Sequence, residues 1–323
     1  MKKIFSIGEA LIDFIPSEKG CPLKDVVSFE RVAGGAPANV SAAIAKLGGA
    51  SGFISQLGQD AFGEYIIEVL KEAGVDTQYV MRTDKAGTGL AFVSLKEDGN
   101  RDFSFYRNPS ADMLLAPEAL EEDWFKDCYG LHFCSVDLVE SPMKYAHKKA
   151  IEYTLAQGGV VSFDPNVRLP LWSSEEACKE AILEFLPYAH IIKISDEELE
   201  FITGYQTIEE AKSLLFKGNA QIIIYTKGGN GAEIYTRNSM TSVEGNKVEV
   251  IDTTGAGDSF IGAFLYKLLE NDVNSEALSH LSEETLKAYL SFANDYAAYS
   301  TLGKGAIGSY ATLEEIENYI VNK

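Results

Sequence analysis

Short apolar runs alternate along this chain with stretches that have apolar residues at helical spacing. Residues 160–163, 191–194 and 221–225 form short apolar runs, whereas residues 175–186 and 208–216 have the helical pattern. Parallel strands need crossover connections, and helices normally supply them, so this alternation predicts a mostly parallel sheet with helices on both faces. We therefore predict an α/β fold with one central sheet.

Two regions, residues 10–32 and 89–107, interrupt that alternation. In the second region, residues 90–95 and 102–106 flank the turn sequence Glu97-Asp98-Gly99-Asn100, which is typical of a β-hairpin. Antiparallel hairpin strands do not easily join a parallel core. We therefore expect both regions to form one small β-sheet outside the parallel core.

The segment Asp252-Thr253-Thr254-Gly255-Ala256-Gly257-Asp258-Ser259-Phe260 follows a predicted strand end at residues 248–251 and precedes a helical pattern at residues 260–269. The N–H groups at a helix N-terminus have no intrahelical acceptor and bind phosphate oxygens, helped by the helix dipole. Gly255 and Gly257 leave the backbone unshielded, so that a polyanion can approach it. The segment therefore indicates an anion site.

Asp258 is a carboxylate beside this anion site, where its charge is repulsive unless it acts on another group. Removal of the proton from an attacking alcohol is such a task, and it indicates phosphoryl transfer to a hydroxyl. The alternative is an ordinary glycine-containing turn in which Asp258 is the helix N-cap.

The segment 252–260 resembles the C-terminal signature of the ribokinase-like (PfkB-type) carbohydrate kinases. Gly34-Gly35-Ala36-Pro37-Ala38-Asn39-Val40 resembles their N-terminal glycine motif, and the two motifs occur in the family order. The resemblance implies a ribokinase-like core with a discontinuous β-sheet lid. The expected core comprises residues 1–9, 34–87 and 109–323, and the expected lid comprises residues 10–33 and 88–108.

Three further segments, residues 105–114, 164–170 and 192–198, resemble the fructokinase branch of this family. The resemblance implies transfer of the ATP γ-phosphoryl group to the 6-hydroxyl of D-fructose, with Asp258 as the general base and the backbone of Gly255, Ala256 and Gly257 as the anion hole. Small pocket changes alter hydroxyl recognition, so a related kinase for ribose, 2-keto-3-deoxygluconate or adenosine is an alternative. A non-catalytic sugar-sensing protein is a second alternative.

The resemblance also implies a sugar site. Asp13 can accept hydrogen bonds from two neighbouring sugar hydroxyls, and Asn39 can donate and accept, although Asn39 could instead cap a helix. A guanidinium binds phosphate as a planar fork, so Arg107 and Arg168 could reach the phosphoryl end, whereas surface ion pairs are their alternative role. The expected substrate-binding residues are Asp13, Gly34, Gly35, Asn39, Arg107, Asn108, Asp164, Asn166 and Arg168.

For the nucleotide, Thr226-Lys227-Gly228-Gly229-Asn230-Gly231 follows a predicted strand and is rich in glycine. It is not a Walker A loop, and the G-x-G-x-x-G of residues 303–308 follows a predicted helix, which is the wrong context for a dinucleotide site. The nucleotide-binding residues that the resemblance implies are Lys193, Thr226, Gly228, Gly231 and Asn294.

Metal sites are also implied by the resemblance. The family has an Asn-x-x-Glu motif for Mg²⁺, and the matching stretch here begins with Ser195 and retains Glu198, which is expected to order the water shell of the ion. A monovalent cation, with K⁺ as the expected activator, is also implied. Its expected ligands are Asp252, Thr254, Ser300, Gly303 and Gly305.

The 323 residues carry a formal net charge of −20, which makes nucleic-acid binding improbable because a phosphate backbone requires a basic surface. Mg²⁺ and local donors must overcome this field when ATP binds. No apolar run reaches the length that a bilayer requires. Residues 1–8 are too short for a signal-peptide core and are predicted to be the first strand. We therefore expect a cytoplasmic protein without a membrane partner.

The four cysteines, Cys21, Cys128, Cys134 and Cys178, have no C-x-x-C spacing. This pattern favours free thiols over a disulfide framework or a zinc site. Cys128, His132 and Cys134 lie close together in sequence, but a metal site there would need a further donor.

The lid is also the expected surface of a homodimer, since members of the family often dimerise through it. The apolar alternation of Leu90, Phe92, Phe103 and Phe105 fits a sheet that is buried on one or both faces. A hinge-mounted lid on a monomer is the alternative.

Overall fold

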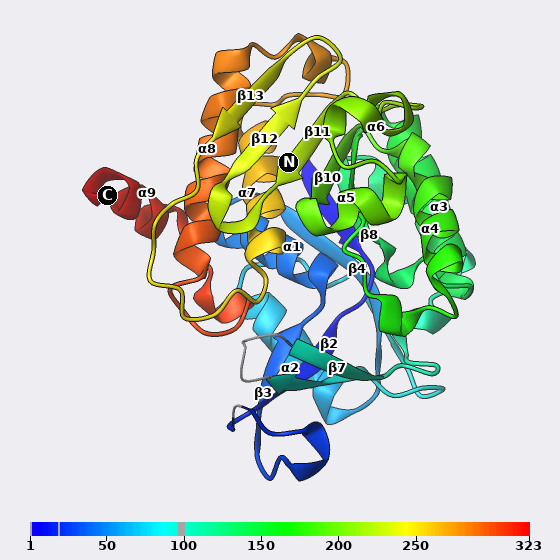
Figure 1. Ribbon diagram of the computed structural model, residues 1–323. Coiled ribbons are helices and arrows are strands. Elements are labelled where there is room, and N and C mark those ends of the chain that lie inside the picture. Colours follow the sequence, from blue (N-terminus) through cyan, green and yellow to red (C-terminus); the bar gives the residue numbers. More distant parts are fainter. Residues whose placement is uncertain (1, 19, 96–100) are drawn as a thin grey trace.

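The protein is described by a computed structural model that covers residues 2–18, 20–95 and 101–323 (Figure 1). Within these residues the larger sheet has nine strands in the order β13-β12-β11-β10-β9-β8-β1-β4-β5. All neighbours from β11 to β5 are parallel, whereas β12 and β13 are antiparallel, so the prediction of a mostly parallel sheet is confirmed. The strands are β1 (Lys3–Ile7), β4 (Ser51–Gly58), β5 (Val80–Thr83), β8 (Cys128–Cys134), β9 (Val160–Asp164), β10 (Ile191–Ser195), β11 (Ile222–Thr226), β12 (Ala232–Tyr235) and β13 (Met240–Val243).

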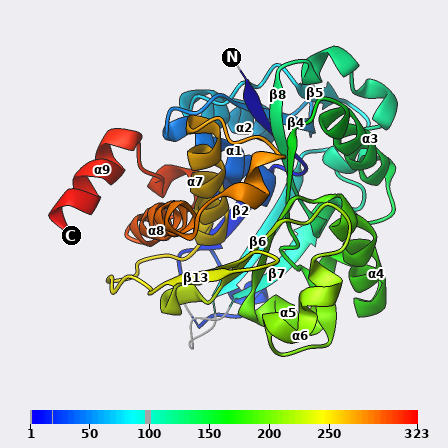
Figure 2. The same ribbon diagram turned by 90° about the horizontal axis from the view of Figure 1, so that it is seen from above.

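Helices cover both faces of this sheet, as Figure 2 shows from above. One face carries α1 (Ala36–Lys46), α2 (Ala61–Glu72), α7 (Ala256–Glu270) and α8 (Glu283–Ser300). The other face carries α3 (Pro142–Ala156), α4 (Glu175–Phe185), α5 (Asp196–Thr203) and α6 (Ile208–Leu215). The final helix, α9 (Leu313–Asn322), follows α8 and projects from the body of the molecule.

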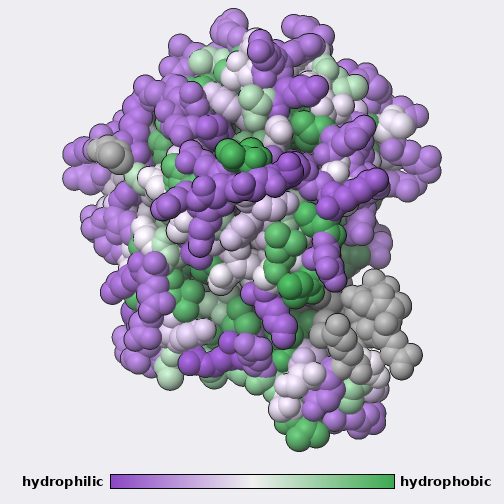
Figure 3. All heavy atoms as spheres, turned by 90° about the vertical axis from the view of Figure 1, so that its left-hand side faces the viewer, coloured by the Kyte–Doolittle hydropathy of each residue, from purple (hydrophilic) through white to green (hydrophobic). Residues whose placement is uncertain are grey.

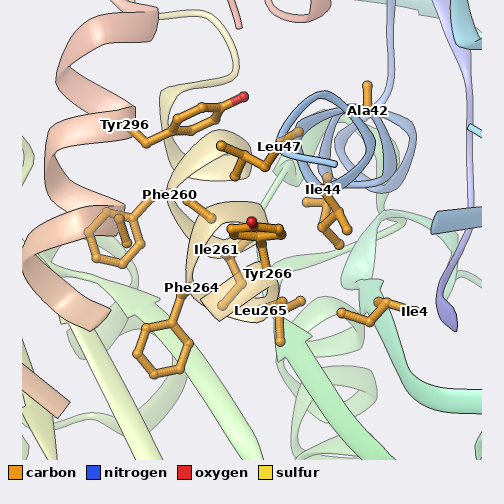
Figure 4. Packing of buried hydrophobic residues seen from close by; sticks show 14 of the residues in the cluster. Ile4, Ala42, Ile44, Leu47, Phe260, Ile261, Phe264, Leu265, Tyr266 and Tyr296 are labelled. Carbon is orange, nitrogen blue, oxygen red and sulfur yellow. The ribbon is translucent and has the colours of Figure 1, made fainter. Parts of the chain in front are cut away.

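α1 and α7 cross closely, and this contact fixes their relative position. A side chain at Gly262 would place its Cβ 2.7 Å from the Cβ of Ala43, so the glycine is what allows the two helices to approach so closely. Ile44 of α1 lies in the same buried cluster as Ile261 and Leu265 of α7 (Figure 4). Close packing of this kind makes the relative placement of the two helix N-termini rigid.

The second sheet has the order β3-β2-β6-β7, which confirms the prediction that both interrupting regions form one small sheet. Its strands are β2 (Leu11–Pro16), β3 (Phe29–Gly34), β6 (Gly89–Leu95) and β7 (Arg101–Tyr106). In Figure 1 this sheet lies at the end of the molecule below the larger sheet. The predicted turn at residues 97–100 and the side chain of Phe103 lie outside the described part of the chain.

Alternation along β2 divides its side chains between two faces of the small sheet. Phe14 stacks on Phe92 with ring centroids 4.7 Å apart and contacts Phe62 of α2 at 5.8 Å. Leu11 and Asp13 alternate with Phe14 along the strand and line a cavity on the other face. One face of the small sheet is therefore packed with aromatic rings, and the other meets the functional site.

The predicted strand end at residues 248–251 is wrong. β13 ends at Val243, and the chain from there to Asp252 is irregular. The N–H groups of Ile251 and Asp252 donate to the carbonyl of Thr301 (2.8 and 3.2 Å) instead of joining a sheet edge. Ile251 is 60% exposed, although β-branched residues are favoured in strands. Residues 248–251 therefore have a local preference for a strand but no neighbouring strand with which to pair.

In the part of the chain that the structure describes, no helix is long and apolar enough to cross a membrane. Figure 3 shows one face of the molecule, on which hydrophilic residues predominate and hydrophobic residues occur in small groups between them. This distribution agrees with the strongly acidic composition of the chain.

Candidate active site

A cavity of about 420 Å³ lies between the small sheet and the carboxyl end of the parallel strands. Ligands of open parallel sheets bind at this edge. We call it the lid cavity. Its lining includes Glu9, Leu11, Asp13, Ile15, Gly35, Asn39, Val93, Phe105, Val136, Asn166, Arg168, Thr254, Gly255 and Asp258.

Two further hollows continue from the lid cavity along the same edge. The central cavity, of about 730 Å³, is lined by Asp164, Asn166, Arg168, Lys193, Ser195, Glu198, Gly255, Gly257 and Asp258. The α8 cleft, of about 640 Å³, is lined by Lys193, Thr226, Gly228, Gly231, Asn246, Lys247, Val248, Val250, Gly257, Asn294 and Ala298. Asp258 is shared by the first two hollows, and Gly257 by the last two. The N-terminus of α7 is therefore the meeting point of all three.

Asp258 lies in the first turn of α7, which begins at Ala256 with Gly255 as its N-cap. The interpretation of Asp258 as an N-cap is therefore wrong. Asn39 Nδ2, in the first turn of α1, donates to Asp258 Oδ2 across 2.8 Å. The residue at the N-cap of α1 is Gly35, so Asn39 is not that cap either.

Burial is the main influence on the Asp258 carboxyl group, and it raises the pKa above its ordinary value. The hydrogen bond from Asn39 and the charges of Lys193 and Arg168 oppose this effect without cancelling it. A carboxylate with a raised pKa is a stronger base than an exposed aspartate, which suits proton transfer from an alcohol.

The glycines before Asp258 keep the backbone accessible. Gly255 has φ +72°, and a Cβ there would lie 2.5 Å from Ala306 Cβ and would collide with the Tyr310 hydroxyl, which donates to the Gly255 carbonyl at 2.9 Å. The N–H of Ala256 donates to the Thr253 carbonyl (3.2 Å). The N–H groups of Gly255, Gly257 and Asp258 are therefore the donors that could bind an anion, because first-turn N–H groups of a helix have no intrahelical acceptor.

Lys193, in the middle of β10, and Asp164, the last residue of the adjacent strand β9, form a buried ion pair of 2.7 Å. Burial lowers the pKa of Lys193, but the carboxylates of Asp164, Glu198 and Asp258 outweigh it, and the net pKa is raised. Burial raises the pKa of Asp164 to about 6 despite its partner. Lys193 therefore remains a cation, and a Cβ at Gly257 would lie only 3.4 Å from its Nζ.

Glu198 is held by two backbone N–H groups: Oε1 accepts from Val167 (2.8 Å) and Oε2 accepts from Ser195 (3.0 Å). Ser195 is the N-cap of α5, which gives this residue a structural role at the position of the family asparagine. Arg168 lines both the lid and the central cavities and is exposed. The structure thus brings Arg168, Asn166 and Glu198 to the same hollow as Asp258.

Two of the expected substrate-binding residues, Arg107 and Asn108, lie outside the lining of the three hollows. The Arg107 side chain is buried, and its Nη2 is bound by the carboxylates of both Asp112 and Asp137. Asn108 is exposed and lies outside the lining of the three hollows.

On the paired strands β2 and β3, Gly34 lies opposite Leu11, two residues before Asp13. A Cβ at Gly34 would collide with Asp13 Oδ2, so glycine at this position makes room for the carboxylate. Gly35 has φ +110°, and a Cβ there would lie 2.5 Å from the carbonyl oxygen of Glu9. The two glycines therefore allow the backbone of residues 34–35 to approach Asp13 and Glu9 closely beside the lid cavity.

The expected cation ligands are brought together in part. Asp252 Oδ1 accepts from the N–H (3.0 Å) and the hydroxyl (2.7 Å) of Thr254, and Oδ2 accepts from the Gly305 N–H (3.0 Å). Ser300 Oγ lies 3.1 Å from Ser259 Oγ at the base of α7. Gly303 packs against Ser309 in the same C-terminal loop. The Asp252 carboxylate thus links two loops that are distant in sequence, those of Thr254 and Gly305.

The predicted nucleotide residues Thr226, Gly228, Gly231 and Asn294 all line the α8 cleft. Asn294 Nδ2 donates to the Glu244 carbonyl at 3.1 Å. Sequence reasoning missed Lys247, Val248 and Val250, which line the same cleft. The sequence pattern had assigned Val248 and Val250 to a strand, but the structure places them in an irregular segment that lines the cleft.

Among the described residues, the buried side chains around His132 do not form a set of metal ligands. His132 Nδ1 lies 3.1 Å from Ser162 Oγ, and Cys134 Sγ lies 3.7 Å from His132 Nε2. Desolvation by burial lowers the pKa of His132 to about 3. Among the described residues, no cluster of three metal-ligating side chains was found.

The geometry defines the class of protein. A lid cavity that opens onto a buried carboxylate, a helix N-terminus and a second cleft beyond it is the site of a phosphotransferase of the sugar-kinase class. The chain belongs to the pfkB family of carbohydrate kinases, whose domain it matches over residues 1–313.

Similar proteins extend this result. The chain is 42% identical over 318 residues to probable fructokinase-4 of Arabidopsis thaliana, covering 98% of this chain and 96% of the relative. A fructokinase structure with bound ATP from Xylella fastidiosa superposes with a TM-score of 0.92 at 34% identity, covering 99% of this chain and 98% of that chain. A double-mutant fructokinase from Vibrio cholerae, bound to fructose, ADP and a potassium ion, has a TM-score of 0.86 at 32% identity, with coverage of 99% and 98%.

Proposed function

We propose that this protein is an ATP-dependent fructokinase, which converts D-fructose and ATP to D-fructose 6-phosphate and ADP. The observation that carries the proposal is the position of Asp258, where the lid cavity and the central cavity meet. The sugar would lie in the first hollow, the triphosphate in the second and the nucleoside in the α8 cleft. The fructokinase names of the relatives support the choice of sugar.

Asp258 would accept the proton of the sugar 6-hydroxyl while the oxygen of that hydroxyl forms a bond to the γ-phosphorus. The bond from the γ-phosphorus to the oxygen of ADP breaks, and ADP leaves with the electron pair. Asn39 holds Asp258 Oδ2 at 2.8 Å, which leaves Oδ1 for the acceptor hydroxyl. This orientation keeps the base in line with the reacting atoms.

Negative charge on the transferred group would be stabilised by fixed donors. The N–H groups of Gly255, Gly257 and Asp258 surround the start of α7, and Lys193 lies close to Gly257. These donors are already in place before reaction, so they require little rearrangement as charge develops. Arg168 adds an exposed cation that lines the central cavity.

The sugar would be held by Asp13 and Asn39, with Gly35 and Asn166 at the walls of the lid cavity. We also propose that residues 10–33 and 88–108 act as a lid that closes over the sugar. A site that activates an alcohol can also activate water, so closure around bound sugar would protect ATP from hydrolysis.

Carboxylate oxygens in the central cavity suit Mg²⁺, which prefers hard oxygen ligands and retains several waters. Asp164 Oδ1 is buried and has no hydrogen-bond partner among the described residues, and Glu198 lines the same hollow. These two residues would hold the ion through its waters. When bound, Mg²⁺ would neutralise charge on the β- and γ-phosphates.

The loops around Asp252 suit a monovalent cation. Asp252, Thr254 and Gly305 are already linked by hydrogen bonds, and Ser300 and Gly303 lie on the same C-terminal segment. A cation there would brace the chain just before Gly255. The potassium ion in the Vibrio cholerae fructokinase structure supports K⁺ as the activator.

A homodimer through the lid completes the proposal. Val27 is 88% exposed and Tyr106 is 65% exposed, and both belong to the lid segments. Light scattering after gel filtration would distinguish a dimer from a monomer. The cytoplasm is the proposed compartment, since Cys128, Cys134 and Cys178 are free thiols, as a reducing environment maintains them.

The function is tested by magnesium-dependent ADP release over a panel of fructose, glucose, mannose, ribose, 2-keto-3-deoxygluconate and adenosine. The position of the phosphate in the product is read by NMR. Fructose is expected to be the preferred acceptor and to give fructose 6-phosphate. Strong preference for another acceptor would overturn the sugar, and sugar binding without ADP release would indicate a sensor.

A further inference from the structure

Glu9 is a buried carboxylate in the connection from β1 to β2, where the chain first passes from the core to the lid. Its Oε1 accepts the N–H of Ala36 at 2.9 Å, and Ala36 is the first residue of α1. Glu9 therefore links two of the chain segments that join the lid to the core. Its side chain is held in one orientation by this bond.

Glu9 lies next to an unusual concentration of charge. Arg107 is a single buried guanidinium, and its charge acts on the three buried carboxylates of Glu9, Asp112 and Asp137. Asp112 and Asp137 bind the guanidinium directly. Glu9 is the member of this group that lines the lid cavity.

The second oxygen of Glu9 lacks a partner. Among the described residues, Oε2 of Glu9 makes no hydrogen bond although it is buried. A buried polar atom without a partner costs free energy, and such atoms in native proteins usually serve a ligand, an ion or a water molecule. Asp137 Oδ2 is also unpartnered, but Asp137 lies outside the lining of the lid cavity.

We propose that Glu9 is a further sugar-binding residue, whose Oε2 makes a hydrogen bond with one non-reacting hydroxyl of the acceptor in the lid cavity. This inference rests on the proposed function, because it places the acceptor sugar in that cavity. Asp13 approaches the cavity from the lid and Glu9 from the core side. The two carboxylates would therefore read different hydroxyls.

The surroundings of Glu9 suit hydrogen bonding in either direction. Burial raises the pKa of Glu9 to about 7, and the charge of Asp112 adds to this effect, whereas Arg107 and the Ala36 N–H oppose it. The carboxyl group can thus donate when protonated and accept when ionised. Arg107 would be a positioning residue, because its charge acts on Glu9 and its side chain does not line the lid cavity.

The test compares Glu9→Gln with the wild-type enzyme. Glutamine retains an oxygen for the Ala36 N–H but presents an amide in place of Oε2. We expect KM for fructose to rise at least about fivefold with little change in kcat, as for loss of a hydrogen bond to a charged group. Asp112→Asn is the matched control, since it alters the same charge cluster at a residue outside the lining of the lid cavity.

Singly deoxygenated fructoses identify the contact. The wild-type enzyme should have a lower kcat/KM for the 1-, 3- or 4-deoxy sugar than for fructose. For one of these positions, this difference from fructose should disappear in Glu9→Gln but persist in Asp112→Asn. Unchanged preferences at every position would overturn the proposal, even if KM rises. If Glu9→Gln does not fold, Glu9→Asp, which withdraws the carboxylate by one methylene, is measured in the same way with the same two outcomes.

The measurements on the wild-type enzyme distinguish a failure of this inference from a failure of the proposed function. No phosphorylation of fructose by the wild-type enzyme would contradict the fructokinase function. The acceptor found by the sugar panel would then supply the deoxy series, and the comparison of Glu9→Gln with Asp112→Asn would still decide the role of Glu9.

Discussion

Asn39 donates its amide Nδ2 hydrogen to Oδ2 of Asp258 across 2.8 Å, although 219 positions separate the two residues in the chain. Each lies in the first turn of its helix, and the close crossing of α1 and α7 at Ala43 and Gly262 brings those turns together. The proposed base is therefore oriented by the same glycine motif that borders the lid cavity.

The first prediction concerns proton transfer. Asp258→Asn is expected to keep the fold and fructose binding but to lower kcat about 100- to 10,000-fold, because the amide cannot accept the hydroxyl proton. Steady-state kinetics and calorimetric fructose titration measure the two effects. Asp272→Asn, at an exposed surface pair with Lys2, is the control. Near-normal turnover in Asp258→Asn would remove Asp258 from the mechanism.

A second prediction follows from the contact between Asn39 and Asp258. Asn39→Asp replaces a donor by a second carboxylate, and like charges raise one another's pKa. The pKa of Asp258 is already raised by burial, so it should rise further. Activity requires the ionised base, and the acidic limb of the pH profile of kcat/KM should therefore move to higher pH. An acidic limb at the wild-type position would contradict this orientation of Asn39.

A third prediction tests the backbone at the start of α7. Gly255→Ala should lower the free energy of unfolding by about 2–4 kcal/mol, because it combines a positive φ with a collision against Ala306 and Tyr310. Urea denaturation gives the free energy. Gly308→Ala is the control, since a Cβ there meets open space. Equal stability of the two variants would show that the backbone at Gly255 adapts freely.

A fourth prediction separates structure from chemistry at Lys193. Lys193→Met leaves Asp164 buried without its cation and should cost about 3–5 kcal/mol of stability. The double variant Lys193→Met with Asp164→Asn should recover most of this loss. Its kcat should remain below that of Asp164→Asn alone, because the cation near Gly257 is lost in addition to the proposed Mg²⁺ ligand. Full recovery of kcat would limit Lys193 to a structural role.

The fifth prediction concerns the monovalent cation. Initial rates at equal ionic strength should be higher in potassium chloride than in sodium or tetramethylammonium chloride, because Asp252 and its neighbouring loop oxygens would order the chain before Gly255. Asp252→Ala should reduce the difference between the salts. Equal rates of the wild-type enzyme in all three salts would count against a cation site.

Much of the fold could be predicted from local patterns. β9, β10, α4 and α6 lie within a residue or two of their predicted ranges, since each is a short segment whose apolar periodicity matches one kind of element. Residues 248–251 are the exception. Their β-branched composition indicates a strand, but pairing depends on a neighbouring edge that local sequence does not reveal.

For the charged residues, too, the sequence predicted some features and missed others. Arg107 was expected near phosphate because a guanidinium suits that ligand, yet Asp112 and Asp137 bind it in the interior. Glu9 gave a weak signal, a carboxylate directly after the first strand, and its burial became evident only from the packing around it. Charge pairing is a long-range property, so residue type alone does not identify the partner.

By itself, the sequence determined the class of fold, the two glycine motifs and the identity of the proposed base, because periodicity and turn chemistry act over a few neighbouring residues. Only the tertiary structure decided which groups meet: Asn39 with Asp258, Lys193 with Asp164, and Glu9 with the lid cavity. Those contacts join segments far apart in the chain, and the packing of helices on the sheet sets the distances between them.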